Sequence, residues 1–118
     1  MNRDRGQATV EFALTLPVWC LLLTSLVQVA VLARDRLAVQ HAAREGARAA
    51  VLADDIGAAG PAARTAVDLS PLDVEARAAP RDATVVVRHV DRTDVPLIGA
   101  LLPDVTVSAS ATMAWEPP

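Results

Sequence analysis

Hydrophobic and polar positions divide the chain into a long apolar run, a helical stretch and a segment of strands. The apolar run extends from Ala13 to Ala33 and contains no charged residue. About 20 apolar residues are what a helix needs to cross the hydrocarbon core of a bilayer, because each residue adds about 1.5 Å. The run therefore predicts a transmembrane helix, which we place at residues 7–33.

Residues 34–54 have the period of an amphipathic helix that extends the apolar run. At about 100° per residue, small apolar side chains gather on one face and polar side chains on the opposite face. The first face, called the small-residue seam below, consists of Val39, Ala42, Ala43, Gly46, Ala47 and Ala50. Small residues let another element approach a helix backbone closely. We expect the protein's own sheet to cover the seam, with a partner subunit as the alternative.

Residues 55–118 are predicted to form a small separate domain. Turn-forming residues come first, and Pro61 can begin a short helix through about Leu69. Beyond it, β-branched residues and an alternation with a period of two predict three strands. These strands lie at residues 74–77, 84–90 and 105–115.

The third predicted strand has the clearest alternation in the sequence. One of its faces is apolar and the other carries mainly threonine and serine. The apolar positions are Val105, Val107, Ala109, Ala111, Met113 and Trp115. A sheet with one apolar face needs a cover, which the amphipathic helix can supply. The predicted fold class is therefore α+β, with a long N-terminal helix (membrane span plus amphipathic extension) packed on a small antiparallel sheet.

An apolar loop separates the second and third predicted strands. Between Pro96 and Pro103 it holds four large aliphatic residues, which are Leu97, Ile98, Leu101 and Leu102. We expect these side chains to fold into the core or to plug the sheet. The alternative is an exposed knob that docks on a neighbouring subunit or on the membrane surface, since exposed apolar patches usually mark contacts.

The charge of the chain argues against nucleic acid as a partner. The chain has 118 residues, of which 53% are hydrophobic, and its net charge is -3 at neutral pH. From Asp54 onward, ten acidic residues stand against five arginines. Binding to a phosphate backbone needs clustered positive charge. We therefore expect no nucleic-acid partner.

Groups that could serve catalysis or metal binding are few and scattered. His41 lies on the polar face of the helix and His89 in a strand, without cysteine or carboxylate at ligand spacing. Both histidines are expected at the surface or its rim. Cys20 lies within the apolar run, where a thiol behaves as a small hydrophobe. The sequence thus predicts no enzyme, no metal site and no cofactor.

The start of the chain combines a short charged leader with an acid at the mouth of the apolar run. Gly6 ends the leader MNRDRG, and Glu11 follows after four uncharged residues, next to Phe12. This pattern resembles a type IV prepilin. A secretory signal that ends at 31–33 is the alternative, although the apolar run is longer than such signals have.

The resemblance to prepilins implies a role for each of these residues. A prepilin peptidase would cut after Gly6, so that Gln7 becomes the new N-terminus. Glu11, Phe12 and Pro17 would then serve helix assembly, and in pilins the glutamate pairs with the amino group of a neighbouring subunit. A lone charge in the bilayer costs about 2.5–3.5 kcal/mol, which favours this pairing over a carboxylate that contacts water at headgroup level. Pro17 would bend the helix for packing or form a passive kink.

The amphipathic helix narrows the resemblance to one family. The motif AAREGARAA, residues 42–50, and the end of the chain, residues 96–115, resemble TadE-like proteins, which are minor pilins or pseudopilins of tight-adherence (Flp) pili. The family implies a cytoplasmic leader at 1–6 and an extracytoplasmic domain at 55–118. It implies as partners a prepilin peptidase, a major Flp pilin, TadE-like and TadF-like subunits, the pilus assembly machinery and membrane lipid. The arginines that flank the apolar run leave the topology open by themselves.

The sequence therefore predicts a pilin-like structural protein that crosses the membrane once and is incorporated in, or assembled beneath, a surface pilus. The alternative is an unprocessed single-span envelope protein whose outer domain binds or scaffolds another component.

Overall fold

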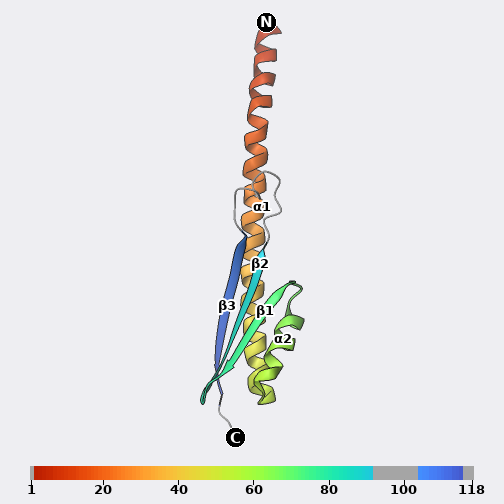
Figure 1. Ribbon diagram of the computed structural model, residues 1–118. Helices are drawn as coiled ribbons and strands as arrows, with labels where there is room; N and C mark the ends of the chain where they lie inside the picture. Colours follow the sequence, from red (N-terminus) through yellow and green to blue (C-terminus); the bar gives the residue numbers. More distant parts are fainter. Residues whose placement is uncertain (1, 92–103, 116–118) are drawn as a thin grey trace. The chain divides into compact units, whose positions relative to one another are not determined.

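The computed structural model describes residues 2–91 and 104–115, with side chains from Arg3 onward. In chain order, the elements are one long helix, a short 3-10 helix, a second α-helix and three strands (Figure 1). The chain divides into two compact units, Met1–Val31 and Leu32–Pro118. The loop between Pro96 and Pro103 lies outside the described residues, so the position expected for it stays a prediction.

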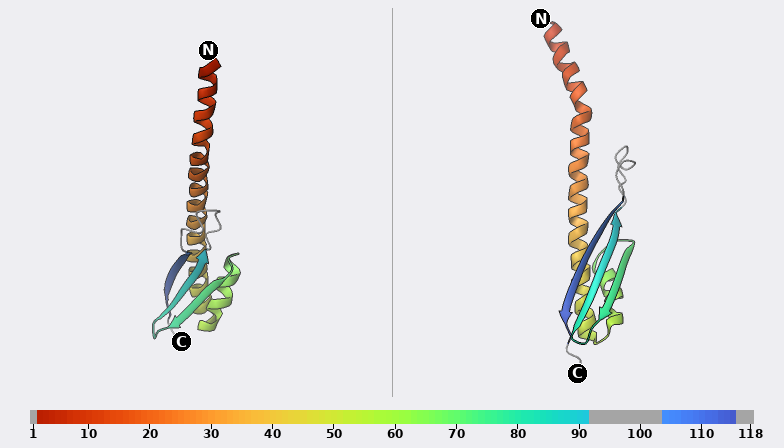
Figure 2. Two further views of the ribbon diagram at one scale, coloured as in Figure 1. Left: turned by 45° about the horizontal axis from the view of Figure 1, so that its top comes forward. Right: turned by 60° about the vertical axis from the view of Figure 1, so that its left-hand side comes forward.

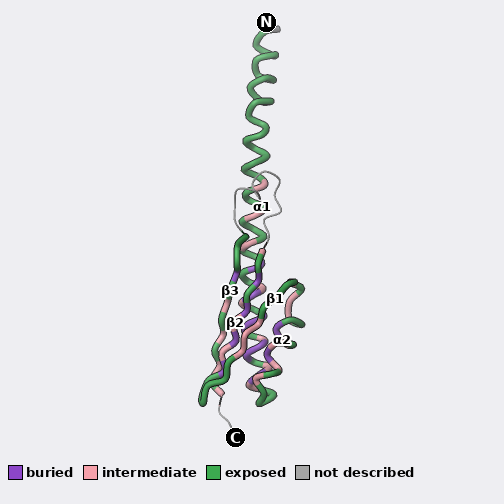
Figure 3. Tube along the Cα trace, viewed as in Figure 1, coloured by how far each residue is buried: buried purple, intermediate pink, exposed green. Residues whose placement is uncertain are grey.

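Helix α1 extends from Asn2 to Ala53 and contains the predicted leader, membrane span and amphipathic extension. It continues through Pro17 even though proline removes one backbone hydrogen bond. Within the first unit the described side chains are exposed, apart from those of Thr24 and Gln28, which are half-buried (Figure 3). The apolar side chains of this part of the helix are therefore exposed around its whole circumference.

The second unit is a sheet that carries helices on one face. Strands β1 (Leu72–Ala78), β2 (Asp82–Asp91) and β3 (Val105–Ala114) pair antiparallel in the order β1-β2-β3. The part of α1 after Val31 and helix α2 (Ala59–Ala66) lie against the same face of this sheet (Figure 2). The architecture is the α+β arrangement that the sequence predicted.

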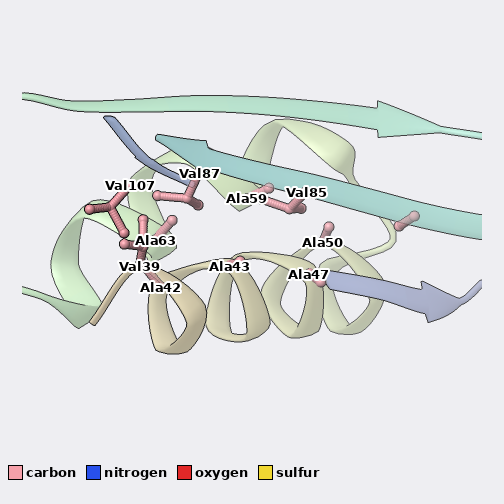
Figure 4. Packing of buried hydrophobic residues seen from close by; sticks show 11 residues of the cluster. Val39, Ala42, Ala43, Ala47, Ala50, Ala59, Ala63, Val85, Val87 and Val107 are labelled. Carbon is pink, nitrogen blue, oxygen red and sulfur yellow. The ribbon is translucent and has the colours of Figure 1, made fainter. Parts of the chain in front are cut away.

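The core of the second unit is made of small side chains. It joins the small-residue seam of α1 to β2 and α2, and Figure 4 shows the alanines of the seam next to Val85 and Val87. The buried apolar residues are Val39, Ala42, Ala43, Ala47, Ala50, Ala59, Ala63, Ala83, Val85, Val87 and Val107. The protein's own sheet covers the seam, as predicted, and α2 shares in that cover.

Gly46 lies where α1 comes very close to its neighbours. A Cβ atom at this position would lie 3.0 Å from the carbonyl oxygen of Ala59, 3.2 Å from Val85 Cγ1 and 3.3 Å from Ala63 Cβ. A backbone oxygen cannot turn aside as the end of a flexible side chain can. Glycine therefore lets α1 approach both α2 and β2 without displacing either of them.

The end of α1 is tied to the end of the sheet. Asp54 follows the helix with a φ of 52°, a left-handed conformation that is common where helices end. Its Oδ1 accepts a hydrogen bond from Trp115 Nε1 at 2.6 Å. The backbone N–H of Trp115 donates to the carbonyl oxygen of Arg81 at 2.6 Å. Trp115 thus joins the end of β3 both to α1 and to the turn between β1 and β2.

The core-facing side of β2 becomes polar toward the end of the strand. His89 shares this side with the buried valines, because side chains of a strand alternate between its faces. It is only 6% exposed, and its Nδ1 lies 2.8 Å from the carbonyl oxygen of Pro71. The predicted surface or rim position is therefore wrong for His89, whereas His41 is exposed as predicted. Asp35 of α1 is a second buried polar residue, also 6% exposed.

The boundaries of the short elements differ from the predicted ones by a few residues. Helix α2 begins at Ala59 rather than Pro61 and directly follows the 3-10 helix Ile56–Ala58. Proline is accepted at the third position of α2 because the first backbone N–H groups of a helix have no partner within it. β1 is longer at both ends than predicted. On β3, Val105 is 39% exposed although it belongs to the predicted apolar face.

The substitution Gly46→Val should lower the free energy of unfolding by about 1–3 kcal/mol, because the added side chain must displace α2 or β2. Helix propensity alone favours valine over glycine. A decrease in the free energy of unfolding would therefore come from disturbed packing. Ala49→Val is the matched control, since Ala49 lies on the same helix beside an open groove. Urea unfolding of the full chain in detergent, followed by circular dichroism, measures both; equal stability of the two variants would contradict the close approach.

Candidate functional site

The candidate functional region is the apolar part of α1. Its length and composition are those of a helix that can cross a membrane. Large apolar side chains are exposed along its whole length; Phe12, for example, is 65% exposed and Leu14 is 72% exposed. Contact of such a surface with water is unfavourable, so the segment needs lipid or other apolar helices around it.

Hydroxyl groups within this segment are hydrogen-bonded to the backbone of the helix itself. Thr24 Oγ1 donates to the carbonyl oxygen of Cys20 at 2.7 Å. Ser25 Oγ donates to the carbonyl oxygen of Leu21 at 2.8 Å. An unsatisfied polar group is costly in hydrocarbon, and these bonds remove that cost. These hydroxyl groups therefore do not prevent burial of the run in a membrane.

Gly6 lies in α1 with open space around it. A Cβ atom at this position would meet no heavy atom within 4 Å. Glycine within a helix costs about 1 kcal/mol relative to alanine, so the helix is easier to unwind at Gly6 than at its alanine positions. The helix is therefore easy to unwind next to the peptide bond between Gly6 and Gln7, and the space around Gly6 is open.

Gln7 and Glu11 are joined by a side-chain hydrogen bond across one helical turn. Gln7 Nε2 donates to Glu11 Oε1 at 3.2 Å. The carboxylate at the mouth of the apolar run therefore has a neutral amide donor beside it. Sequence reasoning singled out both residues but missed their contact, although residues four apart are neighbours on a helix surface.

The other predicted assembly residues are not all gathered in one place. Phe12 and Pro17 both lie on the exposed part of α1. They are five residues apart, so they project from different sides of the helix. The predicted packing residues Ala43, Gly46, Ala47 and Ala50 are buried within the second unit. The seam is thus occupied by the protein's own core, which overturns the alternative of a partner subunit there.

Comparison with known proteins concerns this same helix. Residues 6–48 match the family model of TadE-like proteins. Over this part of its length the chain is TadE-like. The match relates the chain to pilin-like proteins of the Tad pilus system. No curated protein and no solved structure matches the chain.

The TadE-like match begins at Gly6, the predicted cleavage position, and includes Glu11 and the whole apolar run. It ends at Arg48, two residues before Ala50, the last residue of the small-residue seam. The match therefore contains the candidate membrane span together with most of the face that packs on the sheet. The resemblance proposed for residues 96–115 lies outside it and stays a prediction.

The TadE-like helix bears exposed arginines directly after its apolar part. They are Arg34, Arg36, Arg44 and Arg48. A guanidinium group is costly to move into hydrocarbon, so these side chains limit how far the helix can enter a bilayer. Arg48 also lines a shallow groove between α1 and α2. The other lining residues are Glu45, Ala49, Leu52, Ala62, Thr65 and Ala66.

The outer face of the sheet carries mostly polar side chains. Arg77 Nε donates to Glu75 Oε1 at 2.9 Å, and Arg88 Nη1 lies 3.5 Å from Glu75 Oε2. The hydroxyl groups of Thr84 and Thr112 are 3.0 Å apart on neighbouring strands. The hydrogen bond and positive charge of Arg77 hold the pKa of Glu75 below its usual value, with a smaller contribution from Arg88.

Metal-binding groups are not gathered in the part of the chain that the structure describes. Within residues 2–91 and 104–115, no three histidine, cysteine, aspartate or glutamate side chains are arranged to hold a metal ion. Cys20 is exposed on the apolar part of α1.

The substitution Arg77→Gln should raise the pKa of Glu75 back toward its usual value. Arg88→Gln should raise it less, because Arg77 supplies the larger share of the effect. Since the pKa of Glu75 is lowered by folding, its stabilising contribution is present above the usual pKa of glutamate and is lost as the pH falls through the lowered value. NMR titration of the side-chain carboxyl carbon measures both variants; equal shifts would contradict the leading role of Arg77.

Proposed function

We propose that this chain is a pilin-like structural protein of a tight-adherence (Flp/Tad) pilus. A prepilin peptidase cuts it after Gly6, and the mature chain joins the assembly through α1. The proposal rests on the exposed apolar helix that lies within the TadE-like match at residues 6–48. Such a helix can be surrounded by lipid before assembly and by other apolar helices afterwards, and both surroundings remove its side chains from water.

Apolar contact alone does not decide how such helices are arranged. Lipid tails are as apolar as leucine, so transfer from the bilayer to a bundle of helices changes the hydrophobic free energy little. Polar groups in the apolar surroundings must then fix the register between subunits. Glu11 is the acid that stands in this position, at the mouth of the apolar run.

Cleavage after Gly6 supplies a partner for Glu11. It frees an α-amino group on Gln7, and such a group is mostly protonated at neutral pH. A carboxylate and an ammonium group that meet between two subunits offset each other's cost in surroundings of low polarity. In the proposed assembly, Glu11 of one subunit therefore pairs with the amino end of the next and sets their relative position.

The order of the elements supports the placement of the chain in the envelope. In this proposal residues 1–6 are a cytoplasmic leader, residues 7–33 cross the membrane, and the domain from residue 55 lies outside the cytoplasm. The partners are the prepilin peptidase, the major Flp pilin, TadE-like and TadF-like subunits, and the assembly machinery. The polar outer face of the sheet suits a domain in water, and the role of the protein is structural rather than catalytic.

The proposed cut is tested by N-terminal sequencing and intact mass of the chain isolated from membranes that contain the peptidase. The natural chain should begin at Gln7. Gly6→Ala should reduce the cut chain by about tenfold or more, which corresponds to about 1.4 kcal/mol in the barrier to cleavage. The substitution alters no contact of the helix, because the space around Gly6 is open.

Other N-termini would lead to different conclusions. A natural chain that begins at Met1 would refute the cut and support the second function, an anchored single-span envelope protein with an outer binding or scaffolding domain. A chain that begins at Arg34 would show that the apolar run is a secretory signal.

The assembly role of Glu11 is tested by Glu11→Gln, which removes the charge and keeps the shape of the side chain. This variant should be cut and retained in membranes but reduced at least about tenfold in sheared surface filaments, since the charge pair of about 1.4 kcal/mol or more is lost. Glu45→Gln is the matched control on the same helix, after the apolar run. Equal amounts of both variants in the filaments would contradict a register role for Glu11.

A further inference from the structure

Gln7, the residue that the proposed cut would expose, has a reaction of its own when it is N-terminal. The unprotonated α-nitrogen of such a glutamine can attack the side-chain carbon Cδ. A new bond from the α-nitrogen to Cδ closes a lactam ring, and the bond from Cδ to Nε2 breaks. One proton passes from the α-nitrogen to the departing nitrogen, which leaves as ammonia. The product, pyroglutamate, can no longer carry a positive charge.

We infer that Glu11 protects the mature N-terminus from this cyclisation, an inference that rests on the proposed cut after Gly6. Gln7 Nε2 donates a hydrogen bond to Glu11 Oε1 at 3.2 Å. The bond draws the side-chain amide toward the following helical turn, whereas the α-nitrogen of Gln7 lies on the preceding side of the residue. Ring closure requires the amide to leave Glu11 and fold back onto its own backbone.

Ring closure needs a free side-chain amide, so an amide that is held by Glu11 leaves the α-amino group of Gln7 intact. An intact amino group can carry a positive charge, and this charged form is the one that can pair with the Glu11 of a neighbouring subunit.

The contact between Gln7 and Glu11 thus has a chemical function in addition to its contribution to helix stability. A glutamine at the new N-terminus can lose its positive charge by cyclisation, and Glu11, four positions later, slows this reaction. Glu11 acts here as a positioning residue, because it takes no part in the covalent step itself.

The experiment compares the full mature chain with its Glu11→Leu variant, both cut in membranes and purified in detergent. During incubation, peptide mass spectrometry measures the fraction of N-termini that have lost the mass of one ammonia molecule. The natural chain should begin with intact Gln7, and the Leu variant should cyclise about twofold faster, which equals about 0.4 kcal/mol. Glu45→Gln, altered far along the helix, should cyclise at the natural rate.

A second comparison keeps the test decisive where the Leu variant is poorly cut. The natural mature chain should cyclise about twofold faster in concentrated urea, which weakens the exposed hydrogen bond between Gln7 and Glu11, than in detergent alone at the same pH. Equal or slower cyclisation without Glu11 or with this bond weakened would overturn the protective role. Natural chain that is already cyclised in membranes would overturn it as well.

These outcomes are distinct from failure of the proposed function. A chain that begins at Met1 removes the premise, and it overturns the cut and the protection together. A chain that begins at Gln7 upholds the cut whatever the rates of cyclisation are, so the two ideas can fail separately.

Discussion

The close approach of α1 to α2 and β2 at Gly46 is the contact on which the folded unit depends. Alanine and valine make up its buried core, so each side chain removes only a small apolar area from water. A small domain also buries a smaller share of its surface than a large one does. The elements offset both limits by packing almost backbone to backbone, where many atoms meet at short distance. Glycine at position 46 is the condition for that distance.

One helix thus meets two different physical demands along its length. Up to Val31 its apolar side chains are exposed on every side, so that part needs an apolar environment from outside the chain. After Val31 one face is buried against the sheet and the other carries arginines. The TadE-like match extends across this change, from Gly6 to Arg48. The matched residues therefore include the apolar segment of this chain together with the start of its packed face.

The fold was accessible from the sequence wherever periodicity was strong. The faces of the seam from Val39 to Ala50 and of β3 are set by backbone geometry and follow from spacing, although Val105 at the start of β3 is exposed. The alternation along β2 puts His89 on the side of Val85 and Val87, but its burial was not predicted, because its partner, the carbonyl oxygen of Pro71, is distant in sequence. The bond between Trp115 and Asp54 likewise depends on tertiary packing. At the candidate site, both residues of the Gln7–Glu11 pair were found from the sequence, but their bond was not.

The Gln7–Glu11 pair also shows how an acid can be carried at the mouth of an apolar helix. A carboxylate without a donor is costly in surroundings of low polarity. In the uncut chain the amide of Gln7 is the donor, and it adds no charge of its own. After the proposed cut, the same residue offers an ammonium group to a neighbouring carboxylate, which is a stronger partner. The weaker bond within one chain can then give way to the stronger one between chains. In the proposed assembly Glu11 has a donor at each stage, and only the second stage requires another subunit, so this exchange of partners would favour assembly.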